Sequence, residues 1–327
     1  GSRHQAAAKI CVYFTRRASL PRSFLHARRR QVTVYVTTSG PGQQRGLGIA
    51  LNRPFVGILK CQISCHQDRD QDGQIDDEVY VYGSYIQSKM FHQGVKCTDC
   101  HDAHTTKLYH YDNQLCTRCH VPDEKNPAGY DNPGHHFHAM GTTGASCVEC
   151  HMPHKNYMVI DPRRDHSIRI PRPYLSVKFG HPNACNNCHS DKSFEWAAAA
   201  IDRIKGPDRP KEARHPAAFH AYRTGSAEAE KLLINASADP GVPAFTQSGA
   251  LLALRAFISD SSNEEAIRQL DSNQSLVRTA AISKLEALSE TKRYQYLVRM
   301  LKDPVRAVRT EAARVLTTVS HSLFDPK

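Results

Sequence analysis

The last part of the chain carries apolar residues at the spacing of amphipathic helices. The stretch "SFEWAAAAIDRI" (193–204) predicts a helix, Pro207 to Pro216 predict a linker, and the remainder is helical in pattern to the end. Val277-Arg278-Thr279 recurs 31 residues later as Val308-Arg309-Thr310, with paired alanines close behind each copy. Paired helices at this kind of period are typical of a HEAT-like α-solenoid, and an unrelated helical bundle is the alternative.

Residues 61–190 show a different pattern. Pro, Gly, Asn and Asp are dense there and long periodic segments are few, so side chains alone give this stretch little material for a core. "EVYVYGSYI" (78–86) alternates well enough to predict a short strand, followed by a helix that carries Met90 and His92. No apolar run reaches the length of about 18 residues that a membrane span requires, and we expect no transmembrane segment.

The cysteines of this stretch follow a repeated motif. Eight of the eleven form four Cys-x-x-Cys pairs, and a histidine follows each pair directly. The motifs are Cys97/Cys100/His101, Cys116/Cys119/His120, Cys147/Cys150/His151 and Cys185/Cys188/His189. A Cys₄ zinc site has no use for the adjacent histidine, and disulfides at this spacing are redox-active rather than structural. Covalent haem explains all three residues, because the thiols bond to the porphyrin and the imidazole then binds its iron.

A fifth motif is looser. Cys61 and Cys65 have three residues between them and His66 follows. The added residue can bulge while both sulfurs still reach a porphyrin, so this is a candidate fifth haem site.

The same stretch holds nine further histidines that follow no cysteine pair. Haem iron takes a sixth ligand, and we predict histidine at every site, which favours electron transfer over catalysis. His104 and His154 lie three residues after a motif histidine, too close to reach the far face of the same iron, so each is expected to bind a neighbouring haem. The candidate sixth ligands are His92, His104, His138, His154, His166 and His181.

"DRDQDGQID" (68–76) matches the first nine positions of a calcium-binding loop. Asp68, Asp70 and Asp72 alternate as ligands would, but position twelve is Val79, where the closing acidic residue belongs. A calcium site and a solvated acidic turn are the two interpretations.

Charge is concentrated at the start of the chain. Residues 1–60 contain nine Arg, two Lys and no acidic residue, which accounts for the formal net charge of +11. Such a block can bind nucleic acid or anionic lipid. It has few aromatic residues and no recognisable nucleic-acid module, so we expect no nucleic-acid partner.

Four segments in order suggest a family. They are "DGQIDDEVYVYGSYIQSKMFHQGVKCTDCHDAH", "CVECHMPH", "DPRRDHSIRIPRPYLSVKFGHPNACNNCH" and "DPVRAVRTEAARVL". Over residues 70–327 the chain resembles multihaem cytochromes c with C-terminal HEAT or tetratricopeptide repeats, relatives of nitrite-reductase-like and octahaem cytochromes. It departs at the start, where "LHARR" (25–29) stands in place of a "CHARR" motif, as though residues 1–67 were truncated or translated out of register.

The expected fold is therefore mainly α. It comprises a basic N-terminal segment of doubtful fold (1–67), a loop-rich multihaem cytochrome c domain (68–205) and a short HEAT-like α-solenoid (206–327). We expect an electron carrier whose repeats dock a redox partner protein or a second copy of the chain. A catalytic multihaem oxidoreductase acting on a small nitrogen or sulfur compound and a self-assembling extracellular cytochrome are the alternatives. Because thioether attachment takes place outside the bacterial cytoplasmic membrane, a periplasmic or extracellular location is expected.

Overall fold

The computed structural model divides the chain into two compact units, residues 1–61 and 62–327. It describes residues 10–11, 32–36, 47–51, 81–124, 126–157, 161–208 and 214–324. In the first unit, β1 (Ile10–Cys11), β2 (Val32–Val36) and β3 (Leu47–Leu51) form an antiparallel sheet in that order, with Val34 opposite Ile49. The sequence-based boundaries at 67/68 and 205/206 stay predictions.

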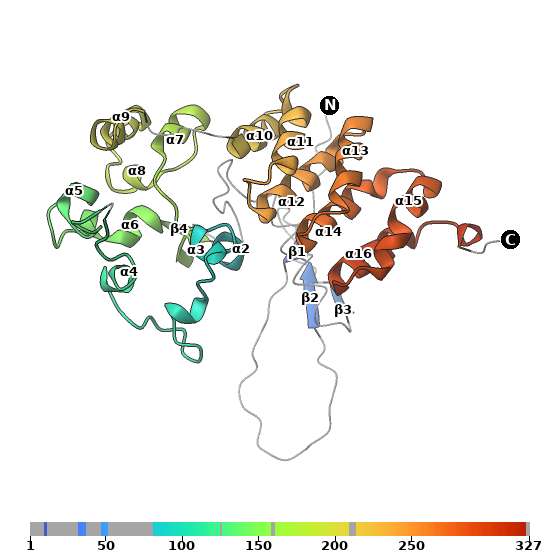
Figure 1. Cartoon of the computed structure of the whole chain (residues 1–327), viewed down its shortest axis with the longest axis horizontal. Helices are drawn as coiled ribbons and strands as arrows, with labels where there is room; N and C mark the ends of the chain where they lie inside the picture. Colours follow the sequence, from blue (N-terminus) through green and yellow to red (C-terminus); the bar gives the residue numbers. More distant parts are fainter. Residues whose placement is uncertain are drawn as a thin grey trace, which may run out of the picture. The chain divides into compact units, whose positions relative to one another are not determined.

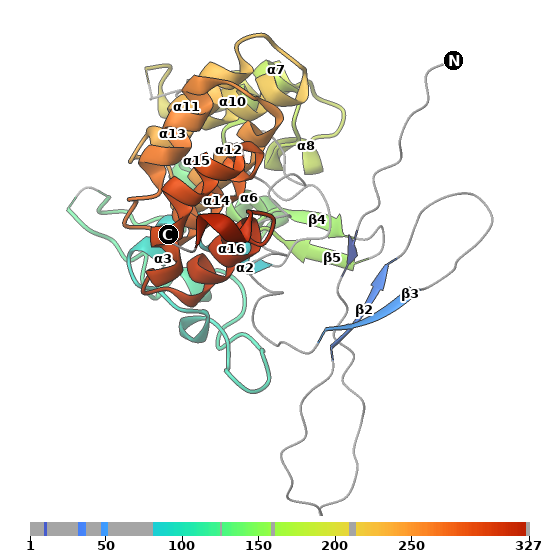
Figure 2. The same ribbon diagram turned by 90° about the vertical axis from the view of Figure 1, so that its right-hand side faces the viewer.

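The second unit begins with short helices separated by long loops (Figure 1). They are α2 (Val81–Tyr85), α3 (Lys89–His92), η1 (Cys97–Asp99), α4 (Gln114–Thr117), α5 (Pro133–His136), η2 (Thr143–Ala145), α6 (Cys147–His151), α7 (Pro173–Phe179), α8 (Ala184–Cys188) and α9 (Phe194–Lys205). Between α6 and α7, β4 (His154–Tyr157) and β5 (Asp161–Arg164) pair as an antiparallel ribbon, which Figure 2 shows side by side. This segment is held by turns and caps far more than by regular elements.

The strand predicted for 78–86 is wrong for its described part. Residues 81–85 form helix α2, and the Ile86 amide donates to the Tyr82 carbonyl oxygen at 3.0 Å. Successive side chains of a strand point to opposite faces, so a strand with one buried face would expose every second residue. Here the adjacent residues Ser84 and Tyr85 are both buried. The Tyr85 hydroxyl donates to the carbonyl oxygen of Val95 and closes the turn that follows. The predicted helix bearing Met90 and His92 is confirmed as α3, which Ser88 caps.

Helices of 8 to 11 residues follow in close succession from residue 214 onward. They are α10 (Arg214–Arg223), α11 (Ala229–Ala238), α12 (Ala244–Ala253), α13 (Asp260–Gln269), α14 (Ser275–Lys284), α15 (Glu290–Leu297) and α16 (Arg306–Leu316), with η3 (Leu254–Ala256), η4 (Leu285–Ala287), η5 (Val298–Lys302) and η6 (His321–Leu323) between or after them. Pro216 lies in the first turn of α10, where proline is tolerated, so the predicted linker is shorter than the sequence suggested.

Three of these helices repeat at a constant interval. α12, α14 and α16 begin at Ala244, Ser275 and Arg306, 31 residues apart, and α14 packs against both of the others. Val277 and Val308, equivalent in the two copies of the repeated sequence, are both fully buried. The sequence recurrence therefore corresponds to a recurrence of packed helices. No helix in the described part of the chain is long and apolar enough to cross a membrane.

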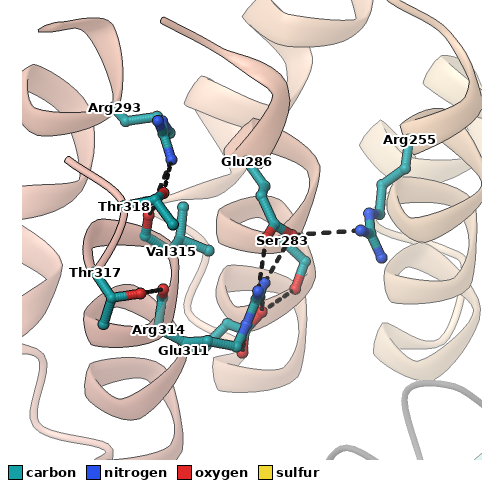
Figure 3. A network of polar contacts seen from close by, with 9 residues as sticks. All are labelled: Arg255, Ser283, Glu286, Arg293, Glu311, Arg314, Val315, Thr317 and Thr318. Carbon is teal, nitrogen blue, oxygen red and sulfur yellow. Dashed lines mark hydrogen bonds and ion pairs between the residues drawn. The ribbon is translucent and has the colours of Figure 1, made fainter. Parts of the chain in front are cut away.

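Polar and charged side chains join α14 and the following η4 to α16 (Figure 3). The Arg314 guanidinium donates to both carboxylate oxygens of Glu286, at 2.7 and 2.8 Å, and also to Glu311 at 2.7 Å. Ser283 donates to Glu311 at 2.6 Å from the facing helix. These paired hydrogen bonds fix the spacing between the two helices more rigidly than apolar packing alone would.

Candidate functional site

Each Cys-x-x-Cys-His motif lies on one short helical turn. η1, α4, α6 and α8 carry the motifs that begin at Cys97, Cys116, Cys147 and Cys185. In the first, second and fourth motifs, the histidine amide donates to the carbonyl oxygen of the first cysteine at 2.9 Å. Because residues i, i+3 and i+4 share one face of a helical turn, both thiols and the imidazole are presented on the same side.

The eight cysteines of these motifs are free thiols. Within the described ranges no group of three or more His, Cys, Asp or Glu is arranged to hold a bare metal ion. Neither the disulfide nor the Cys₄ zinc arrangement is thus formed by these residues.

Thiols of successive motifs lie near one another. A hydrogen bond from Cys147 lowers the pKa of Cys116 to about 7, and the same contact raises the pKa of Cys147. Burial, helped by the nearby Cys185, raises the pKa of Cys150 to about 11. The second motif therefore adjoins the third, and the third adjoins the fourth.

Three of the four motif histidines face a second imidazole. The ring centroids are 6.3 Å apart for His101 and His166, 6.2 Å for His151 and His135, and 6.1 Å for His189 and His138. The ring planes of the three pairs lie within 26°, 13° and 29° of parallel. Two imidazoles bound through Nε2 to opposite faces of one metal ion, at metal–nitrogen distances of about 2.0–2.1 Å, have centroids about 6.3 Å apart. The observed spacing fits that geometry.

Hydrogen bonds at Nδ1 favour the same interpretation. Nδ1 of His101 lies 2.7 Å from the Thr106 carbonyl oxygen, and Nδ1 of His166 lies 3.0 Å from that of Arg164. A carbonyl oxygen only accepts, so each Nδ1 carries a proton, and in the neutral ring Nε2 then presents a lone pair. Carbonyl partners of this kind are those that orient metal-binding histidines.

In each of the other two pairs, one ring has a carbonyl partner of the same kind. Nδ1 of His151 lies 2.7 Å from the Arg169 carbonyl oxygen, and Nδ1 of His138 lies 2.6 Å from that of His136. Four of the six paired imidazoles thus have a carbonyl oxygen at Nδ1. Burial lowers the pKa of His135, which favours the neutral form of that ring. Metal binding requires this neutral form.

A tight turn after β5 positions His166. The buried Asp165 accepts hydrogen bonds from the amide and hydroxyl of Ser167, at 2.9 and 2.5 Å. Arg164, the last residue of β5, forms an ion pair with Glu149 of α6 at 2.6 Å. The β4–β5 ribbon therefore places His166 near His101 of the first motif, which lies 65 positions earlier in the sequence.

The structure brings together only some of the predicted sixth ligands. His138 and His166 lie opposite motif histidines, whereas His135, which also does, was missed by sequence reasoning. The available signal was "HHFH" (135–138), from which we selected one histidine although two motifs follow it closely.

The remaining predicted ligands have other surroundings. His92, His104 and His154 are exposed, and among the described residues no ring contact joins any of them to a motif histidine. His181 is buried, with Nδ1 2.9 Å from the Pro182 carbonyl oxygen. Their roles as ligands stay predictions.

The second motif differs from the other three. His120 is exposed, and its ring meets Tyr130 edge-on at a centroid distance of 5.8 Å. Within the described ranges it faces no second imidazole.

The looser motif, Cys61/Cys65/His66, and the acidic loop, Asp68, Asp70 and Asp72, lie outside the described residues.

Comparisons with models of known protein families, with curated proteins and with solved structures found no match for this chain.

Proposed function

We propose that this protein is a c-type cytochrome that carries electrons along a row of covalently bound haems. The observation that carries the proposal is the set of three near-parallel imidazole pairs, each containing the histidine of a Cys-x-x-Cys-His motif. Haem c, when bound, supplies a redox-active iron. The chain's own residues attach it through two thiols, bind it on both faces and hold it next to another motif.

The axial pairs favour electron transfer over catalysis. His101 with His166, His151 with His135, and His189 with His138 would hold three haems between paired imidazoles, which would leave no position for a substrate at those sites. The proximity of thiols from successive motifs supports close spacing of the haems. Close spacing is what transfer along a row of haems requires.

A catalytic oxidoreductase acting on a small nitrogen or sulfur compound is the second candidate. One observation favours it: His120 faces Tyr130 rather than an imidazole within the described residues. In that case the site at Cys116 and Cys119 would be where a small molecule binds.

The helices from 214 onward support a HEAT-like α-solenoid, because α12, α14 and α16 begin 31 residues apart and pack in sequence. Such a surface suits docking of a redox partner or a second copy of the chain. Thioether attachment outside the cytoplasmic membrane implies a periplasmic or extracellular protein.

Counting haems tests the proposal. Protein made in a bacterial host with haem-attachment machinery should give four haems per chain as the denatured pyridine haemochrome, with a low-spin, six-coordinate spectrum. The double substitution Cys61→Ala, Cys65→Ala should leave four; a fall from five to four would add the looser motif. Protein that carries zinc, or no haem, would overturn the assignment.

Ligand binding separates the two candidates. For the electron carrier, reduced protein should bind no carbon monoxide, and oxidised protein no cyanide. Binding of one equivalent per chain would favour the catalytic candidate.

A further inference from the structure

Two histidines three residues apart face two different motifs. His135 lies opposite His151 of the third motif, and His138 lies opposite His189 of the fourth. On a continuous helix, residues i and i+3 share one face and would point to the same side. The backbone between them must therefore turn.

Phe137 makes that turn. It follows α5 with φ 63° and ψ 18°, a left-handed conformation that residues with a Cβ rarely adopt, and its amide still donates to the Pro133 carbonyl oxygen. The Lys205 ammonium lies 4.8 Å from the centroid of the Phe137 ring. The left-handed residue ends the helix and directs His138 away from the face that carries His135.

Gly144 lies against the His138 imidazole. A Cβ at this position would lie against Cδ2 of His138, 2.5 Å from Cγ and 2.8 Å from Nε2. Real Cβ atoms do not approach so closely, so an added methyl group requires the ring to move. The φ of Gly144 is not in the left-handed region, so alanine is compatible with the backbone.

The backbone at Gly144 cannot readily yield instead. The next residue, Ala145, is buried, and its carbonyl oxygen accepts from the Asn113 side chain at 2.9 Å. The Asn113 Oδ1 in turn accepts from the Cys147 amide at 2.8 Å. Gly144 is therefore tied to the start of the third motif, and His138 is the part that would shift.

We propose that residues 133–144, here called the ligand segment, supply the sixth ligand to two different haems, and that Gly144 is the positioning residue for His138. This inference rests on the proposed function. The ligand segment joins the haem at Cys147 and Cys150 to the haem at Cys185 and Cys188. Displacement of His138 opens one iron without affecting the thioether bonds.

Gly144→Ala tests the inference in the haem-loaded protein. The haem count should equal that of the wild type, while one haem equivalent changes from low-spin to high-spin in the electron paramagnetic resonance spectrum. The reduced variant should bind one more equivalent of carbon monoxide than the wild type. A wild-type spectrum, or the loss of a haem, would overturn the role given to Gly144.

Gly134→Ala is the matched control. It lies in the same segment, where a Cβ would meet only the Oδ1 of the Asn132 side chain, at 3.0 Å. Its spectrum and carbon monoxide binding should match the wild type. A high-spin haem in this control would show that the segment tolerates no substitution and would overturn the specific role of Gly144.

A double-mutant cycle identifies the residue through which Gly144 acts. His138→Ala should give the same single high-spin haem, and the double variant Gly144→Ala, His138→Ala should give one, not two. Two high-spin haems would mean that Gly144 acts through another ligand and would overturn the inference. A protein without any haem would instead contradict the proposed function itself.

Discussion

Residues 81–205 and residues 214–324 are built on different principles. Among their described residues, and leaving prolines aside, the first region buries four apolar side chains, Tyr85, Ala145, Leu175 and Ala197, whereas the second buries 26. In the second region α12, α14 and α16 begin 31 residues apart, and α14 packs against both of the others. The first region instead places imidazole pairs at the spacing that a bound group would fill.

The difference shows where folding energy must come from. A region of more than a hundred residues with almost no apolar core cannot offset its conformational entropy by side-chain burial. In our proposal, haems with their thioether and histidine bonds supply the missing core. The helices after residue 214 need no such addition.

The largest effect should follow from withholding haem. We expect protein made without attachment machinery to lose structure over residues 81–205 while α11 to α16 stay folded. Hydrogen exchange should show fast exchange in the first region and protected amides in the second. Equal protection in both regions would contradict the idea that haem forms the core.

Breaking a buried ion pair should be the next largest change, confined to the second region. Arg278 donates to both oxygens of Asp303, at 2.8 and 3.0 Å, with side chains only 11% and 6% exposed. Arg278→Ala leaves a carboxylate buried without its partner, which costs about 3–5 kcal/mol. Urea unfolding followed by circular dichroism at 222 nm measures the loss, and haem absorbance should not change before that transition.

Arg299→Ala is the matched control, because Arg299 makes the same type of pair with Asp271 on the surface. Exposed pairs contribute about 0–1 kcal/mol. Equal losses of unfolding free energy in the two variants would mean that burial does not determine how much the Arg278–Asp303 pair contributes to stability.

Acid should weaken the second region through two carboxylates. Burial raises the pKa of Asp303, but hydrogen bonds from Arg278 and the Val305 amide outweigh it and leave the pKa lowered; hydrogen bonds from Arg314 lower the pKa of Glu286. The unfolded chain binds these protons first, so their stabilising contribution is full above the ordinary values of about 3.9 and 4.3. It is lost as the pH falls through the lower folded pKa values.

Unfolding free energies measured between pH 7 and pH 3 test this expectation. Asp303→Asn should be less stable at pH 7 and should lose less stability in acid than the wild type. An unchanged pH dependence would show that other groups control the acid response.

The smallest effect on stability should come from a change with a clear spectroscopic result. His166→Ala removes the imidazole opposite His101, so one haem should become high-spin while the unfolding of α11 to α16 is unchanged. Electron paramagnetic resonance and urea unfolding of the same sample measure both. A spectrum identical to the wild type would show that His166 is not a ligand.

Patterns in the sequence predicted those structural features that depend only on residues a few positions apart. The four motifs form single helical turns, and the repeated Val-Arg-Thr marks packed helices, because both features depend on residues a few positions apart. The strand predicted at 78–86 is wrong because the alternation of Val and Tyr in the sequence does not determine which side chains are buried. The adjacent residues Ser84 and Tyr85 are both buried, on helix α2.

Pairing of the histidines could not be predicted in this way. His166 reaches His101 because a β-ribbon and a buried Asp165 position it, and neither is visible in the spacing of histidines. His135 and His138 separate because Phe137 is left-handed, a conformation that sequence preference disfavours. The long-range arrangement decides which imidazoles meet.

The contact between Cys116 and Cys147 has a consequence for the order of biosynthesis. The hydrogen bond from Cys147 lowers the pKa of Cys116 to about 7, so about half of Cys116 is thiolate at neutral pH, next to a thiol of a different motif. A chain that folded before receiving its haems in an oxidising compartment would join these two sulfurs as a disulfide. Each would then be lost to its own motif. Haem attachment should therefore precede folding, while the motifs are still apart.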